Sequence, residues 1–380
     1  MRTLARALAL LLPVTLLAAC DEDVTDPGYE PPPEEVFGVE SRGWGYSKGT
    51  IKMNTNVLNG ADVSTVRFGY PTAYGQEVTD IYLTNVGWLG ADMATVRVVD
   101  GALQATKSGQ TISAHAFEGS VWFMEVNGEF AYMILEDVRY AGEVGLSNYG
   151  SKLMTNLDPD RLVYKWTSPY SPTAGTKVDS KTGLGGAYDG VHTCAKDGDG
   201  DVWTIMSRGL LINEASGDVS TTSWNMNQYA YIGCLSGAAA KTMMWGYSHD
   251  NPNGGLPNVG LAEYEAALRA TRADFCGDGK AHTQPGKAVT LLDSWGINQH
   301  HADATTDEAV FGPSGALCVE TPRWSYYTAP IKCGDGRTIP LCRTFSHCVA
   351  APLWKCYYDT AEDVFNEDSS ALIWTRNAAF

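Results

Sequence analysis

The chain has 380 residues, 44% of them hydrophobic, and a formal net charge of −17. This length and hydrophobic content predict a globular protein large enough for two domains. The acidic balance and the lack of any extended run of Lys and Arg exclude nucleic acid as an expected partner, because binding to phosphates needs a basic face.

The first twenty residues have the pattern of an export signal. Arg2 and Arg6 precede an apolar stretch, Ala7 to Ala19, which is too short to span a bilayer and is typical of a signal peptide over residues 1–19. The ending Leu17-Ala18-Ala19-Cys20 resembles a bacterial lipoprotein processing site. That resemblance implies a lipid on Cys20 and an exported protein anchored to the cell membrane or the outer membrane. The alternative is an ordinary signal peptide with an incidental cysteine.

Residues 20–36 are acidic and rich in proline. They include Pro31, Pro32 and Pro33 and contain no Lys or Arg, a composition that cannot bury a core. The sequence therefore predicts a tether that holds the folded body away from the lipid surface.

The remaining cysteines all lie in the C-terminal half of the chain. In an exported protein an even number of cysteines without a Cys-x-x-Cys pair favours disulfides over a metal or redox site. The sequence leaves their pairing open. These disulfide candidates are Cys194, Cys234, Cys276, Cys318, Cys333, Cys342, Cys348 and Cys356.

Residues 37–169 consist of short β-rich runs separated by turn residues. The clearest signal is a hairpin in which Val121 to Val126 and Phe130 to Leu135 flank Asn127-Gly128, a dipeptide that tolerates the positive φ angles of a tight turn. Repeated short strands must bury one face, so a β-sandwich-like N-terminal domain, or an open barrel, is expected.

A segment rich in Ser, Pro, Thr and Gly between Ser168 and Gly190 marks the expected boundary, and residues 186–380 form the second domain. Here strands mix with helical patterns, the best being Gly260 to Cys276 and a second Ala238 to Tyr247. The predicted fold class is mostly β with some α (α+β), with a disulfide-stapled α+β C-terminal domain.

A group of motifs between Tyr188 and Trp324 carries a family resemblance. The central one is Ala273-Asp274-Phe275-Cys276 followed by Gly277-Asp278-Gly279 and His282-Thr283. The chain resembles the ADYC-domain proteins, exported proteins named for an Ala-Asp-Tyr-Cys motif, in which Phe275 replaces the tyrosine. The family's cysteines at positions 242 and 267 are Thr242 and Ala267 here. Their joint loss implies that these two positions pair in relatives.

An acidic turn follows Cys194. Asp197, Asp199 and Asp201 alternate with glycine, and such carboxylates can wrap calcium. However, Val202 and Arg208 occupy the positions where an EF-hand needs Gly and the bidentate Glu. A plain acidic turn is favoured, so no cofactor is expected and calcium is kept as an alternative.

The motif itself offers Asp274, Asp278 and His282 as candidate acid, base or metal-binding groups. A structural role is favoured, because Asp278-Gly279 is a turn dipeptide and a carboxylate at a helix end can bond neighbouring amides. His300, His301, Asp303 and Asp307, near His249 and Asp250, lack the spacing of a metal site. Trp324, Tyr326 and Tyr327 are candidate surface aromatics for a sugar or protein partner.

These patterns predict a lipid-anchored envelope protein that serves as a non-catalytic binding or structural module. The expected partners are the membrane, through the lipid anchor, and an envelope protein or glycan. The alternative is a secreted hydrolase acting on glycan or peptide through Asp274, Asp278 and His282.

Overall fold

The computed structural model describes residues 47–48, 53–58, 61–69, 76–83, 86–88, 90–126, 129–145, 158–168, 191–195, 202–213, 215–221, 226–249, 259–283, 287–300, 304–344 and 360–377. All of its helices and strands belong to one compact unit, Val39–Phe380. The expected fold class, mostly β with some α, is confirmed.

Eight strands form the largest sheet, in the order β10-β9-β5-β4-β16-β13-β11-β12. Their bounds are β4 Thr65–Phe68, β5 Gln76–Tyr82, β9 Val121–Val126, β10 Glu129–Tyr140, β11 Leu162–Ser168, β12 Val191–His192, β13 Trp203–Arg208 and β16 Tyr229–Cys234. Because β10 also pairs with β11, seven of these strands close into a barrel rather than forming two facing sheets. All pairs are antiparallel except β4 with β5.

Alternation along the strands fills the barrel. Trp122 and Met124 of β9 and Met133 of β10 are fully buried inside the barrel. The residues that alternate with them along each strand, such as Phe123 and Tyr132, point outward. A small sheet packs on this core, formed by β6 (Arg97–Val99), β7 (Ala102–Lys107) and β8 (Gln110–Ser113). The buried Tyr164 hydroxyl joins the two by accepting from the Leu103 amide and donating to the Gly101 carbonyl.

The barrel takes strands from both sides of the expected domain boundary. β4, β5, β9, β10 and β11 precede residue 169, and β12, β13 and β16 follow residue 186. The boundary itself falls in residues 169–190, outside the described residues. The division into domains 37–169 and 186–380 stays a prediction.

A five-stranded antiparallel sheet has the order β1-β17-β22-β18-β19. Its strands are β1 Ser47–Lys48, β17 Ala288–Asp293, β18 Thr306–Gly312, β19 Gly315–Val319 and β22 Ile373–Asn377. Ala309 and Phe311 of β18 share a core with α2 (Leu261–Arg272), whereas Val310 shares one with α3 (Ala361–Glu367). Because adjacent strand residues face opposite sides, the two helices cover opposite faces of this sheet.

The helix α1 (Ala238–Met244) covers the outer side of the barrel at β16 and packs against α2. A Cβ on Gly233 would lie 3.2 Å from the Ala240 Cβ, so a glycine on β16 and alanines on α1 permit this close approach. Both predicted helices are present and shorter than expected. α2 ends at Arg272 because Ala273 adopts a left-handed conformation with φ of 53°.

The smaller elements are the pairs β2 (Val57–Leu58) with β3 (Ala61–Asp62), β14 (Leu210–Ile212) with β15 (Val219–Thr221), and β20 (Ile331–Lys332) with β21 (Thr338–Ile339), and the 3₁₀ turns Met93–Thr95, Ala114–Phe117, Met226–Gln228 and Cys342–Thr344. Within the described part of the chain, no helix is long and apolar enough to cross a membrane.

Three disulfides tie the C-terminal half together: Cys194 to Cys234, Cys276 to Cys333, and Cys318 to Cys342. The prediction that these cysteines are structural is confirmed for all six. Cys348 and Cys356 lie outside the described residues. Disulfides persist in oxidising surroundings, so these bonds indicate an oxidising environment.

Candidate functional site

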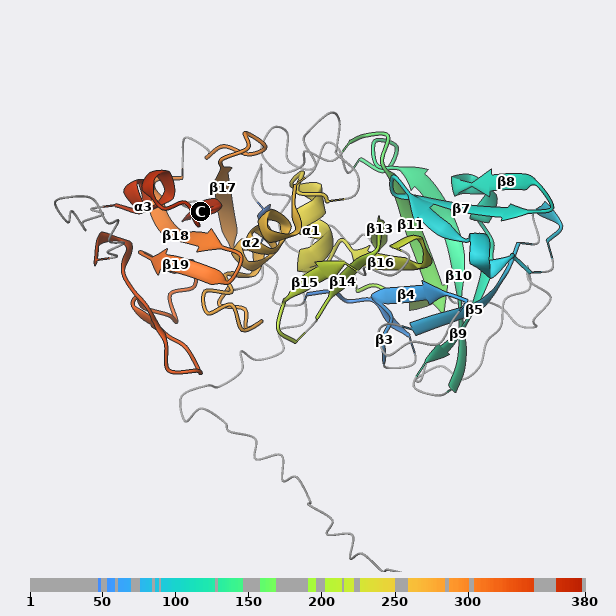
Figure 1. Cartoon of the computed structure of the whole chain (residues 1–380), viewed down its shortest axis with the longest axis horizontal. Coiled ribbons are helices and arrows are strands. Elements are labelled where there is room, and N and C mark those ends of the chain that lie inside the picture. Colours follow the sequence, from blue (N-terminus) through green and yellow to red (C-terminus); the bar gives the residue numbers. More distant parts are fainter. Residues whose placement is uncertain are drawn as a thin grey trace, which may run out of the picture. The chain divides into compact units, whose positions relative to one another are not determined.

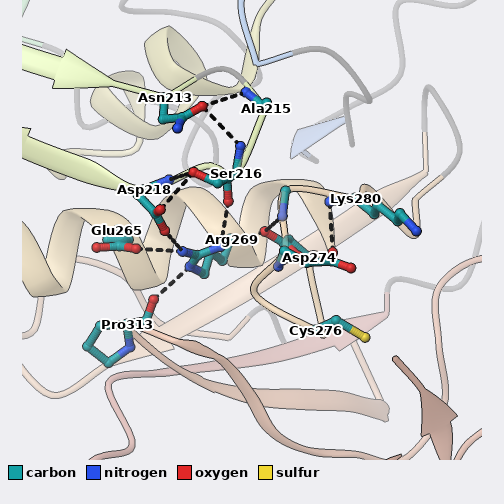
Figure 2. Close-up of polar contacts among 12 residues, drawn as sticks. Asn213, Ala215, Ser216, Asp218, Glu265, Arg269, Asp274, Cys276, Lys280 and Pro313 are labelled. Atoms are coloured by element: carbon teal, nitrogen blue, oxygen red, sulfur yellow. Dashed lines mark hydrogen bonds and ion pairs between the residues drawn. The ribbon is translucent and has the colours of Figure 1, made fainter. Parts of the chain in front are cut away.

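The Ala-Asp-Phe-Cys motif begins where α2 ends, and Arg269 in the last turn of α2 is the centre of its polar contacts (Figure 2). Arg269 is 2% exposed, and its guanidinium uses every one of its N–H donors. Nε donates to the Pro313 carbonyl at 2.6 Å, and Nη1 donates to the Ser216 carbonyl at 3.2 Å and to the Asp274 carboxylate at 2.7 Å. Nη2 donates to Asp218 at 2.9 Å and to Glu265 at 2.6 Å.

These contacts join three segments that are distant in the sequence. Ser216 and Asp218 lie in the turn between β14 and β15, and Pro313 lies in the turn between β18 and β19, shown in orange in Figure 1. Arg269 therefore fastens both turns to α2. The charges nearby raise the pKa of Arg269 although burial opposes this, so the guanidinium stays protonated.

Asp274 is 1% exposed and both of its carboxylate oxygens are engaged. Oδ1 accepts from the Asp278 amide at 3.2 Å, and Oδ2 accepts from the Gly279 amide at 3.0 Å as well as from Arg269. Burial raises the pKa of the Asp274 carboxyl, opposed by Arg269, Arg272 and the Gly279 amide. The carboxylate holds the Gly-Asp-Gly turn in place, as expected of an aspartate at a helix end.

The two glycines of that turn are required by close backbone approaches. A Cβ on Gly277 would lie 2.0 Å from the Ser314 carbonyl oxygen, and one on Gly279 would lie 1.8 Å from the Ala215 carbonyl oxygen. Both residues also have positive φ, 66° and 82°. The turn can thus pass between the β18–β19 and β14–β15 turns only without side chains at these positions.

His282 closes the motif against the end of α2. Its backbone amide donates to the carbonyls of Arg272 and Ala273, and its Nδ1 lies 3.1 Å from the Ala273 carbonyl oxygen. Since a carbonyl only accepts, Nδ1 carries the proton. The ring is 7% exposed and packs edge-on against Tyr327, with centroids 4.7 Å apart. Burial lowers the pKa of His282, opposed by its hydrogen bonds and the nearby aspartates, so the neutral imidazole is favoured.

Arg323 completes the end of the helix. Nη2 donates to the Ala270 carbonyl at 2.7 Å and Nη1 to the Thr271 carbonyl at 3.3 Å. A bidentate contact with Glu308 of β18, at 2.6 Å through each of two nitrogens, holds the guanidinium there. The last carbonyls of α2 are therefore bonded by Arg323, His282 and the motif's own amides, which accounts for groups that a helix end otherwise leaves unsatisfied.

The motif does not bring its three candidate catalytic groups together in one exposed site. Asp274 and His282 are buried and bonded to different parts of the backbone, and the half-buried Asp278 accepts from the Lys280 amide at 3.0 Å. The disulfide from Cys276 to Cys333 and the hydrogen bond from Arg337 to the Cys276 carbonyl, 2.7 Å, fix the motif from the other side.

The other candidate residues have separate partners. His300 Nδ1 lies 3.2 Å from the Thr290 hydroxyl, Asp307 pairs with Arg376 at 2.7 Å, and His249 Nε2 lies 3.3 Å from the Arg208 carbonyl. Cys20, Asp197, Asp199, Asp201, Asp250, His301 and Asp303 lie outside the described residues. No three His, Cys, Asp or Glu residues of the described part are placed to hold a metal ion. The calcium alternative stays a prediction.

Trp324, Tyr326 and Tyr327 do form one cluster, with ring centroids 5.2 to 5.3 Å apart. Tyr326 is 53% exposed, and Tyr327 rests on His282. Sequence reasoning identified these rings as surface candidates. It missed Arg269 and Arg323, whose roles depend on contacts across 44 to 53 residues of chain.

The fold and site define a mostly β protein with a disulfide-tied motif at the end of a buried helix. The family model of the ADYC domain matches residues 143–325, so this region of the chain is an ADYC domain. No curated protein and no solved structure matches the chain. The matched region includes β11 to β19, α1 and α2, whereas β1, β4, β5, β9, β10 and β22, which complete the two sheets, lie outside it.

Proposed function

We propose that this protein is a lipid-anchored module of the cell envelope, displayed outside the cytoplasm, which binds an envelope protein or glycan and does no chemistry through its motif. The observation that supports this most strongly is the state of Asp274 and His282. Both are buried, and their polar atoms hold the Gly-Asp-Gly turn and the end of α2.

The same observation disfavours the hydrolase alternative. A general acid or base must reach a substrate proton, and a nucleophile must reach an electrophilic carbon. Asp274 already accepts three hydrogen bonds, and His282 lies between Phe275 and Tyr327. The motif acts instead as a clamp that gives the surface around it a fixed form.

The clamp is tested by comparing Asp274→Asn with Asp278→Asn in thermal unfolding. Asp274→Asn removes the charge that faces Arg269 in a buried position, so a loss of about 1 to 3 kcal/mol and a lower yield of secreted protein are expected. Asp278→Asn makes the same chemical change four residues later, at a half-buried position. It should change the free energy of unfolding by less than about 0.5 kcal/mol. A secreted Asp274→Asn protein with unchanged stability would count against the clamp.

A further inference from the structure

The outer side of strands β5, β9 and β10 carries a group of exposed and half-buried rings. Because Trp122, Met124 and Met133 point into the barrel, their neighbours Phe123 and Tyr132 point outward. The group, called the aromatic face below, consists of Tyr82, Phe123, Phe130 and Tyr132. Tyr82 and Phe130 are 39% and 83% exposed. Figure 1 shows these three strands side by side.

Three rings of the aromatic face, Tyr82, Phe123 and Tyr132, form a continuous strip across the strands, and Phe130 is two residues before Tyr132 on the same side of β10. The centroids of Tyr82 and Phe123 are 4.9 Å apart, and those of Phe123 and Tyr132 are 6.0 Å apart. Phe123 and Tyr132 are directly opposite in the β9–β10 ladder, and the rigid pairing holds the strip in place. Exposed aromatic surface of this kind on a barrel wall is typical of an interaction site.

Two glutamates border the strip on the same side of the sheet. Glu125 lies directly opposite Phe130 on one neighbouring strand and directly opposite Glu77 on the other. Like charges placed opposite each other destabilise a sheet. Neither carboxylate pairs with a cation of the described residues, whereas Glu136 further along β10 pairs with Lys165 at 3.0 Å.

Elsewhere in the molecule, cations of the chain lie over rings that are themselves buried. Arg376 lies 4.2 Å from the centre of the Trp374 ring, Lys107 lies 5.8 Å from that of Trp88, and Arg67 lies 5.3 Å from that of Tyr229. No cation of the described residues lies over the aromatic face. It combines the two groups that bind a guanidinium or ammonium, rings and carboxylates. Arg67 of β4 is directly opposite Glu77, and its guanidinium lies over the Tyr229 ring.

We propose that the aromatic face binds a basic segment of a partner protein, whose Arg or Lys side chains stack on Phe123, Phe130 and Tyr132 and pair with Glu77 and Glu125. This proposal rests on the proposed binding function and names the class of its partner. A second copy of the chain is a poor occupant, since both copies would bring the same acidic border and a net charge of −17. A neutral glycan would use the rings and leave the two glutamates unpaired.

The test uses the full-length protein in detergent and three probes: a fluorescent peptide of alternating arginine and tyrosine, the same peptide with glutamate in place of arginine, and chitohexaose. Only the arginine peptide should bind. The double variant Glu77→Gln/Glu125→Gln should weaken that binding about tenfold, the sum of two exposed ion pairs. Phe130→Ser should weaken it as well, without unfolding the barrel, because this ring is largely exposed.

A matched control separates this site from general attraction to an acidic protein. Glu362→Gln/Glu367→Gln on α3 also removes two negative charges, at a different place on the surface. It should change the affinity for the arginine peptide less than twofold. Equal losses in both double variants, binding of chitohexaose that Phe130→Ser abolishes, or a dimer that Phe130→Ser dissociates would each overturn the proposal. None of these outcomes bears on Asp274 or on Cys20, so the proposed function is judged separately.

Discussion

At the scale of single residues, a partly buried histidine makes the free energy of unfolding depend on pH. His300 lies against the Trp374 ring, with centroids 4.6 Å apart, and near Thr290. Burial lowers the pKa of His300 to about 3, and Arg376 adds to this effect. The neutral form is therefore the one that the fold accommodates.

His300 should make the protein less stable in mild acid. Its folded pKa lies below the unfolded value of about 6.5, so its contribution is complete above that pH and is lost as the pH falls toward 3. Between pH 7 and pH 5 the loss amounts to at most about 2 kcal/mol, and His300→Gln should flatten this pH dependence. Urea unfolding at both pH values measures it, with the exposed His115→Gln as the control. A steep dependence that persists in His300→Gln would contradict this assignment.

At the scale of elements, the pair of Arg323 and Glu308 joins α2 to β18. Glu308 is fully buried, and Arg323 bonds it while capping the end of α2. The guanidinium of Arg323 thus bonds both the last carbonyls of α2 and the Glu308 carboxylate of the strand. The two elements should be energetically coupled through it.

This coupling can be measured with a double-mutant cycle. Arg323→Met leaves the Glu308 carboxylate buried without its partner and should cost about 3 to 5 kcal/mol of unfolding free energy. Adding Glu308→Leu should recover part of that loss, because the unpaired charge is then removed. Losses that simply add up in urea unfolding would show that the two residues act independently.

Local patterns predicted several elements and could not predict how they assemble. The Asn127-Gly128 signal located the β9–β10 hairpin, and the three- and four-residue spacing located α2, since both depend on neighbouring residues. The closure of the barrel by β10 with β11 and the place of β22 between β17 and β18 join distant strands. No short-range periodicity encodes such pairings.

The same distinction holds for the candidate site. The position of Asp274 after a helical pattern, next to a turn dipeptide, indicated a structural carboxylate, and its contacts agree with this. Arg269 had only one local signal, the Glu265 four residues earlier. Its links to Ser216 and Pro313 depend on turns that reach α2 from other parts of the fold.

At the scale of the whole molecule, the proposed display joins a predicted export signal and a predicted acidic tether to the disulfide-tied body. The three disulfides fit an oxidising environment, and the motif fastens turns of the body to α2. Display at the envelope then depends on one atom outside the described residues, the sulfur of Cys20, to which a lipid would be attached. Several acyl chains give stable anchoring, whereas one gives only marginal binding.

Cell fractionation of the wild-type protein and Cys20→Ser tests this central claim most directly. The wild-type protein should sediment with membranes, incorporate labelled palmitate and be released only by detergent. Cys20→Ser should lose the label and appear in the soluble fraction, with its six described cysteines still paired. A Cys20→Ser protein that stays with the membranes would contradict the lipid anchor and the display function built on it.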